Sequence, residues 1–267
     1  METMNEWAGS DLEDLQTAVD LLEYPGLIAK VSDLLGTPIE ALFRSLPAGA
    51  GDKIAVATQK SLTAAVNAAV WTMQPRQRTT PWAKAHTAAA GVAGGVGGAF
   101  GLAALPIELP VTTTIIMRSI ADIARGEGEN ILDPATRIAC LEVFAMGGPS
   151  TDDDAAESGY FAVRTALAQA VSEAAKYVAR RAVIEDGAPV IVRLLAQVAA
   201  RFNTVVAEKI MAQGVPVVGA VGGATINVLF IDHFQDMARG HFIVRRLERT
   251  YGEAEVRKRY GELVAGR

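Results

Sequence analysis

Two glycine-rich, uncharged segments dominate the sequence: residues 85–107 read AHTAAAGVAGGVGGAFGLAALPI, and residues 210–231 read IMAQGVPVVGAVGGATINVLFI. Neither contains an acid, a lysine or an arginine, and each reaches the roughly 20 residues that a helix needs to cross a bilayer. Length alone does not predict a span, because glycine offers lipid almost no apolar area. We therefore expect a helical hairpin core that is buried or dips into a membrane, with a true span as the alternative.

The spacing of the glycines supports close helix packing. Gly94 and Gly98, and likewise Gly219 and Gly223, are four residues apart, so small residues share one face of a helix and neighbouring backbones can approach. A phosphate-binding P-loop is excluded, because its G-x-x-x-x-G-K-[ST] pattern needs a lysine that neither segment supplies. The residues predicted to pack helices together or to face lipid are Gly94, Gly98, Gly101, Pro106, Pro110, Pro216, Gly219, Gly223 and Asn227.

Helical patterns continue through most of the remaining chain. Pro134 directly follows Asp133, the arrangement expected at a helix N-terminus. Further helices are predicted over about residues 189–211, 217–251 and 253–264. No segment shows sustained period-two alternation, which a half-buried strand would need. The predicted fold class is therefore all-α: a single multi-helix bundle with two Gly/Ala-rich, close-packed helical segments.

The overall composition excludes several classes of protein. Of 267 residues, 50% are hydrophobic and 21% are charged, which excludes a disordered or fibrous chain. The net charge of -5 argues against a nucleic-acid partner, because attraction to phosphate supplies most non-specific affinity. The single cysteine, Cys140, cannot form an internal disulfide or a thiolate metal cluster, and it is expected to be a packed core thiol. Acids near Met1 argue against a signal peptide, so a cytoplasmic location is expected.

Charge is distributed in blocks. Residues 1–50 carry nine acids against two bases, and residues 126–190 carry eleven acids against five bases. Residues 51–125 carry seven bases against three acids, and residues 191–267 carry eleven bases against seven acids. The two basic blocks also hold the apolar segments, and basic residues beside apolar surface favour an anionic membrane face. Uneven scatter of surface charge by chance is the alternative.

A short sequence motif follows each glycine-rich segment. Residues 122–126 read DIARG and residues 236–240 read DMARG, both at positions where a helix could end or turn. Paired helices of similar design would explain the match, and coincidence is the alternative.

Longer matches accompany these segments. Residues 105–113 (LPIELPVTT) and 117–125 (MRSIADIAR), then Asp133-Pro134 and residues 141–144 (LEVF), form a first block. Residues 215–227 (VPVVGAVGGATIN) form a second. Together the blocks resemble the EcsC protein family, with Glu108 replacing the aspartate of its Pro-x-Asp-x-Pro pattern. Ala238, Phe242, Arg245, Leu247 and Tyr251-Gly252 extend the second block.

The resemblance runs from about Val31 to Tyr260. It divides the chain into an acidic helical segment (1–30), an EcsC-like helical domain (31–260) and a C-terminal tail (261–267). It implies an accessory role near membranes, linked to an ABC transporter, on the inner face of the cell membrane. The family supplies no established active site and no cofactor.

Five residues are weak candidates for catalysis: Glu108, Asp122, Asp232, His233 and Asp236. Carboxylates and an imidazole at helical spacing can act as acid and base or hold a divalent metal. The alternative is that Glu108 and Asp122 form buried ion pairs and caps that hold helices in register. No H-E-x-x-H or two-His-one-carboxylate pattern occurs, so no metal site is predicted.

Three classes of function remain open. The first is a non-enzymatic helical protein that docks on the inner membrane face, on lipid or on a membrane protein such as an ABC transporter. The second is a lipid-binding module whose bundle opens around the glycine-rich helices. The third is a hydrolase or other enzyme that uses the five candidate residues where the two blocks meet. The sequence assigns no oligomeric state.

Overall fold

The described part of the protein consists of helices. The computed structural model describes residues 7–23, 27, 30–31, 49–72, 105–147, 159–181, 188–213 and 219–267, and it shows no strand among them. The predicted all-α fold is therefore confirmed. The helices are α1 Gly9–Glu23, α4 Ala50–Thr72, α6 Leu105–Gly126, α7 Pro134–Glu142, α8 Gly159–Arg181, α9 Pro189–Gln213, α10 Gly219–Tyr251 and α11 Glu253–Ala265, with a short 3-10 helix, η2, at Val143–Ala145.

Local sequence signals set several of these boundaries. The Asp133 carboxylate accepts a hydrogen bond of 3.0 Å from the backbone N–H of Ala135, and Pro134 occupies the first turn of α7, as predicted. Helix α10 ends at Tyr251 because Gly252 adopts a φ of 87°, a left-handed conformation that favours glycine. The predicted limits of α9, α10 and α11 agree with the structure within about two residues, the usual uncertainty of helix ends.

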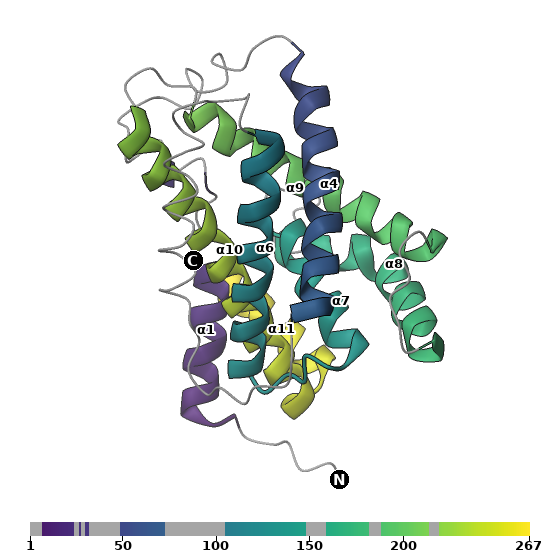
Figure 1. The fold of residues 1–267 in the computed structure, drawn as a ribbon. Helices are drawn as coiled ribbons and strands as arrows, with labels where there is room; N and C mark the ends of the chain where they lie inside the picture. Colours follow the sequence, from purple (N-terminus) through teal and green to yellow (C-terminus); the bar gives the residue numbers. More distant parts are fainter. Residues whose placement is uncertain are drawn as a thin grey trace.

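Helix α6 lies at the centre of the bundle (Figure 1). It packs against α4 and α10, and α4 also contacts α9. Helix α1 packs along α10, while α8 contacts α7 and α9 at the edge of the bundle. Helices α6 and α10, which carry the two matched sequence blocks, are therefore direct neighbours.

Four phenylalanines form the aromatic centre of the core. Phe144 of η2 lies 5.1 Å from Phe202 of α9 and 5.4 Å from Phe234 of α10, measured between ring centroids. Phe230, one turn before Phe234, lies 5.2 Å from it. All four rings are buried. Pairs at these separations contribute roughly 0.5–1.5 kcal/mol beyond their buried area, so the cluster holds η2, α9 and α10 together.

Cys140 is buried on α7, and burial raises the pKa of its thiol to about 12. The prediction of a packed core thiol is confirmed.

Five of the predicted packing or lipid-facing positions lie in the described part. Pro106 is exposed and Pro110 half-buried in the first turns of α6. Gly219 begins α10, Gly223 is buried one turn later, and Asn227 is fully buried. The other predicted positions lie outside the described residues: Gly94, Gly98, Gly101 and Pro216.

The two copies of the short motif form the same local ion pair in different settings. Asp122 pairs with Arg125 at 2.5 Å, and Asp236 pairs with Arg239 at 3.4 Å, both three residues apart. The first copy ends α6, as expected. The second copy lies within α10, which continues past Gly240 to Tyr251, as the helix predicted over residues 217–251 requires.

Candidate functional site

A buried ion pair joins α6 to α9. Lys209 Nζ lies 2.5 Å from Glu108 Oε1, with the lysine side chain fully buried and that of the glutamate 7% exposed. Thr112, one turn further along α6, donates a hydrogen bond of 3.0 Å to the same carboxylate oxygen. The Lys209 ammonium also lies 4.7 Å from the centre of the Phe230 ring, within cation–π range. Burial lowers the pKa of Lys209, and the neighbouring Glu108 opposes this shift.

The ion pair marks the end of the bundle at which both glycine-rich segments attach. Glu108 is three residues from Leu105, where α6 begins within the last part of the first segment. Lys209 is four residues from Gln213, where α9 ends within the second segment. Because Glu108 and Lys209 touch, the chain leaves the first segment and enters the second on the same side of the bundle. We call the region around Leu105, Glu108, Lys209 and Gln213 the glycine-rich end.

Apolar side chains are exposed at this end. Ile107 is 76% exposed and Val111 is 47% exposed. They are four residues apart on α6 and therefore lie on the same helix face. Pro106 beside them is also exposed. The glycine-rich end thus presents an apolar strip to its surroundings, next to a buried and hydrogen-bonded ion pair.

Three of the four candidate carboxylates, Glu108, Asp122 and Asp236, have separate cationic partners. Glu108 pairs with Lys209 on α9, whereas Asp236 pairs with Lys30 at 3.0 Å as well as with Arg239. Asp122 pairs locally with Arg125, and Asp232 is half-buried on α10. The described residues contain no group of three or more His, Cys, Asp or Glu side chains able to hold a metal ion. The hypothesis of a shared catalytic cluster stays a prediction.

His233 is a buried residue held against a turn. Burial and the neighbouring Lys30 charge lower its pKa to about 3, so the imidazole is neutral. The ring packs against Gly147, where any larger residue would collide with it, because a Cβ atom there would lie 2.2 Å from His233 Nε2. The imidazole therefore occupies the space left by this glycine.

A second polar cluster, which the sequence does not reveal, connects α8 to α10. The Tyr160 hydroxyl lies 3.0 Å from His241 Nδ1, and Arg164 donates to the same hydroxyl at 3.4 Å. Arg164 also forms two hydrogen bonds with Glu248, at 2.6 and 3.2 Å. Burial lowers the pKa of His241, so this ring is neutral.

Glu142 lies buried beside this cluster. Burial raises its pKa to about 7, while the positive charges of Arg164 and Arg245 oppose the shift and Glu248 adds to it. The Tyr160, Arg164, His241 and Glu248 set comes from helices far apart in sequence, so no local spacing could have predicted it. Its arrangement is that of a structural hydrogen-bond network between helices.

Comparison with known proteins provides the family. The model of the EcsC protein family matches residues 22–247, most of the chain. The chain belongs to the EcsC protein family. No curated protein and no solved structure matches it. The matched region includes both blocks that carry the resemblance, and the helices that hold most of these blocks, α6 and α10, pack side by side in this EcsC bundle.

Arginines of the EcsC chain that the charge pattern assigns to a basic block are engaged internally. Arg246 of α10 pairs with Asp11 at 3.2 Å and with Asp14 at 2.5 Å, both on α1. It also pairs with Glu127, after α6, at 2.9 Å. The acidic start of the chain therefore neutralises part of the basic last block. These charges hold helices together and do not contribute to a basic rim for a membrane.

Glu129 anchors a similar set of contacts at the end of α6 opposite Glu108. It pairs with Arg245 at 2.9 Å and with Arg249, and it accepts a hydrogen bond of 2.9 Å from Thr136. Burial acts to raise the pKa of Glu129, but hydrogen bonds and positive charges from these partners outweigh it and lower the pKa. This network closes the loop between α6 and α7 onto α10.

One helix in the described part of the EcsC chain is long and apolar enough to cross a membrane, namely α9. One third of its most apolar window is buried in the bundle. Its contacts with α4, α8 and α10, and its buried Lys209, are also those of a core helix.

Proposed function

We propose that this EcsC protein is a non-enzymatic membrane-associated protein that docks on a lipid surface through its glycine-rich end. The observation that supports this proposal most is the Glu108–Lys209 contact, because it brings an attachment point of each long apolar segment to one side of the bundle. Much of the second segment, including Ile226, Phe230 and Ile231, is buried in α10, so the first segment is the one proposed to contact lipid.

The exposed apolar strip supports the same orientation. Ile107 and Val111 would lie at the membrane surface if the adjacent segment, residues 85–104, contacts lipid. In sequence, Arg76, Arg78 and Lys84 precede that segment. Basic residues near a membrane surface contribute about 1 kcal/mol each toward binding anionic lipid, so anionic vesicles are the appropriate probe. An accessory role beside an ABC transporter, which the family suggests, is compatible with docking on this surface.

Flotation with liposomes tests the proposal. Val111→Asp places a charge in the exposed strip, whereas Leu132→Asp places the same charge in the loop after α6, at the other end of that helix. Both side chains are 47% exposed, so the two changes disturb folding to a similar degree. We expect wild type and Leu132→Asp to float with anionic vesicles and Val111→Asp to float about tenfold less, because a buried apolar contact is replaced by a solvated charge.

The flotation results distinguish docking through the glycine-rich end from other modes of binding and from no binding. Equal flotation of the two variants would contradict docking through the glycine-rich end. Absence of wild-type flotation with both anionic and neutral vesicles would contradict lipid docking altogether. A carbonate wash then separates peripheral binding, in which the protein is released, from true spanning, in which all of it stays in the membrane pellet.

A further inference from the structure

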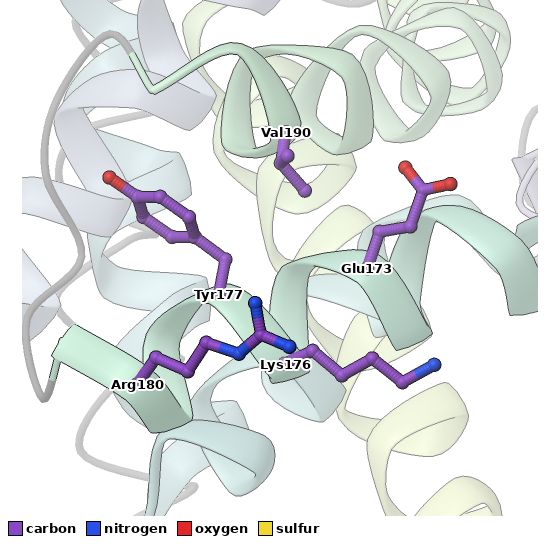
Figure 2. Close-up of a pocket in the computed structure, with 5 residues that line it drawn as sticks. All are labelled: Glu173, Lys176, Tyr177, Arg180 and Val190. Atoms are coloured by element: carbon purple, nitrogen blue, oxygen red, sulfur yellow. The ribbon is translucent and has the colours of Figure 1, made fainter.

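A groove separates the second half of α8 from the start of α9. Its volume is about 490 Å³, within the range of small-molecule sites. Figure 2 shows Val190 pointing from α9 into the space that the α8 side chains surround, with Tyr177 on one side and Glu173 on the other. The lining residues are Glu173, Lys176, Tyr177, Arg180 and Val190.

The groove contains two cations without an acidic partner among the described residues. Lys176 and Arg180 are both exposed, and the two lie one turn apart on α8. Like charges at this spacing repel each other on the helix surface. Glu173, the acid in the groove, pairs instead with Arg193 of α9 at 3.0 Å. Within the described ranges, no salt bridge of Lys176 or Arg180 occurs, and both side chains line the groove.

The groove also has an apolar side. The Tyr177 ring and the Val190 side chain are half-buried and form part of its lining, so an organic group can pack against them while an anion contacts the cations (Figure 2). Arginine binds two oxygens of one phosphate through its planar guanidinium, and lysine adds a point charge. A phosphate monoester carries a charge of about -1.5 to -2 at neutral pH, which the two cations balance.

We propose that the α8–α9 groove binds a phosphate group carried on a small organic molecule. This site is independent of the docking surface. Val190 and Lys209 are 19 residues apart on one helix, or about 28 Å at 1.5 Å per residue. A lipid headgroup in a membrane at the glycine-rich end therefore does not reach the groove, which favours a soluble ligand.

Binding of phenyl phosphate to the full chain tests the proposal. The groove variant is Lys176→Gln/Arg180→Gln. The control is Lys53→Gln/Lys60→Gln, which removes two exposed lysines from α4 and changes the net charge equally. Calorimetry at low salt should show binding about tenfold or more weaker in the groove variant and unchanged in the control, because both charge-assisted contacts to the phosphate are lost. Thermal melts of both variants confirm that they fold.

Vesicles of phosphatidic acid, with phosphatidylcholine vesicles as reference, distinguish the source of the phosphate. Binding of phenyl phosphate that only the groove variant loses supports the proposal. Binding of phosphatidic acid alone, lost in the groove variant, would assign the groove to a lipid headgroup and overturn the soluble ligand. Equal weakening in both variants, or no binding of either probe, would overturn the phosphate site.

Discussion

The buried Lys209 is the residue whose loss should be most costly. Lys209→Ala leaves the Glu108 carboxylate buried without its cation, and breaking a buried pair in this way costs about 3–5 kcal/mol. Urea unfolding of Lys209→Ala, compared with the exposed control Lys53→Ala, measures this loss. The double variant Glu108→Leu/Lys209→Met should recover most of the stability, because apolar residues of similar size often replace a buried pair without loss. If the double variant is as unstable as Lys209→Ala, the loss of stability does not come from an unpaired buried Glu108 carboxylate.

Glu142 should make stability depend on pH. Its pKa is raised from 4.5 to about 7 in the folded state, so the folded protein holds a proton that the unfolded chain releases. The contribution of Glu142 to stability therefore falls as pH rises from about 4.5 to about 7, by at most about 1.4 kcal/mol for each pH unit, and levels off above. Arg164, Arg245 and Glu248 are the charged groups around it.

Glu142→Gln should remove this dependence. The difference in unfolding free energy between variant and wild type, measured from pH 4 to 8, isolates Glu142 from Glu129, His233 and His241. The lowered pKa values of these three groups act on stability with the opposite sign. A constant difference over this range would contradict a buried, proton-binding Glu142.

At the residue level, sequence reasoning identified Glu108 as an ion-pair residue but not its partner. Lys209 stands on another helix about a hundred residues away, and nothing in a helical pattern specifies which neighbouring helix meets it. Tyr160 and His241 escaped prediction for the same reason. Spacing along one helix predicts neighbours on that helix, such as Asp122 and Arg125, and no others.

At the scale of single elements, two glycines with the same backbone conformation provide a matched test. Gly147 and Gly128 both have a φ of 80°. In Gly147→Ala the new Cβ meets His233 Nε2 at 2.2 Å, whereas in Gly128→Ala the nearest atom, on Arg249, is 3.8 Å away. We expect Gly128→Ala to cost about 1–2 kcal/mol from backbone strain alone. Gly147→Ala should cost about 1–3 kcal/mol more from overpacking.

Thermal melts of both alanine variants check this difference. Measured in a His233→Ala background, Gly147→Ala should cost only the backbone part, because the imidazole that the new Cβ would meet is absent. Equal losses of stability in Gly147→Ala and Gly128→Ala would show that the His233 imidazole does not pack against the turn at Gly147.

Helix boundaries were the best-predicted elements, because local chemistry sets them. Asp133 and Pro134 specify the start of α7, and Gly252 specifies the end of α10. The motif at residues 236–240 does not end its helix, because a glycine can also lie within a helix where another helix approaches. A Cβ at Gly240 would lie 2.6 Å from Leu22 of α1, so this glycine serves helix packing.

At the scale of the whole molecule, the sequence predicted an all-α bundle but not which acidic and basic residues pair between helices. The acidic start of the chain was treated as a separate feature, yet Asp11 and Asp14 bind Arg246 of α10. Block charges show where acids and bases are in excess, and only the fold shows which of them meet. The packing of α1 on α10 thus converts an apparent surface pattern into internal contacts.

The single thiol, Cys140, is buried, so its reaction with a reagent can measure how often the EcsC bundle opens. With a pKa of about 12 and little exposure, Cys140 reacts with alkylating reagents only when α7 separates from its neighbours. Since no other cysteine competes, the mass of the alkylated chain counts opened molecules directly. Liposomes that bind the closed bundle should slow this labelling, whereas liposomes that require the bundle to rearrange should accelerate it. The rate of Cys140 labelling therefore shows whether membrane docking leaves the helical core intact.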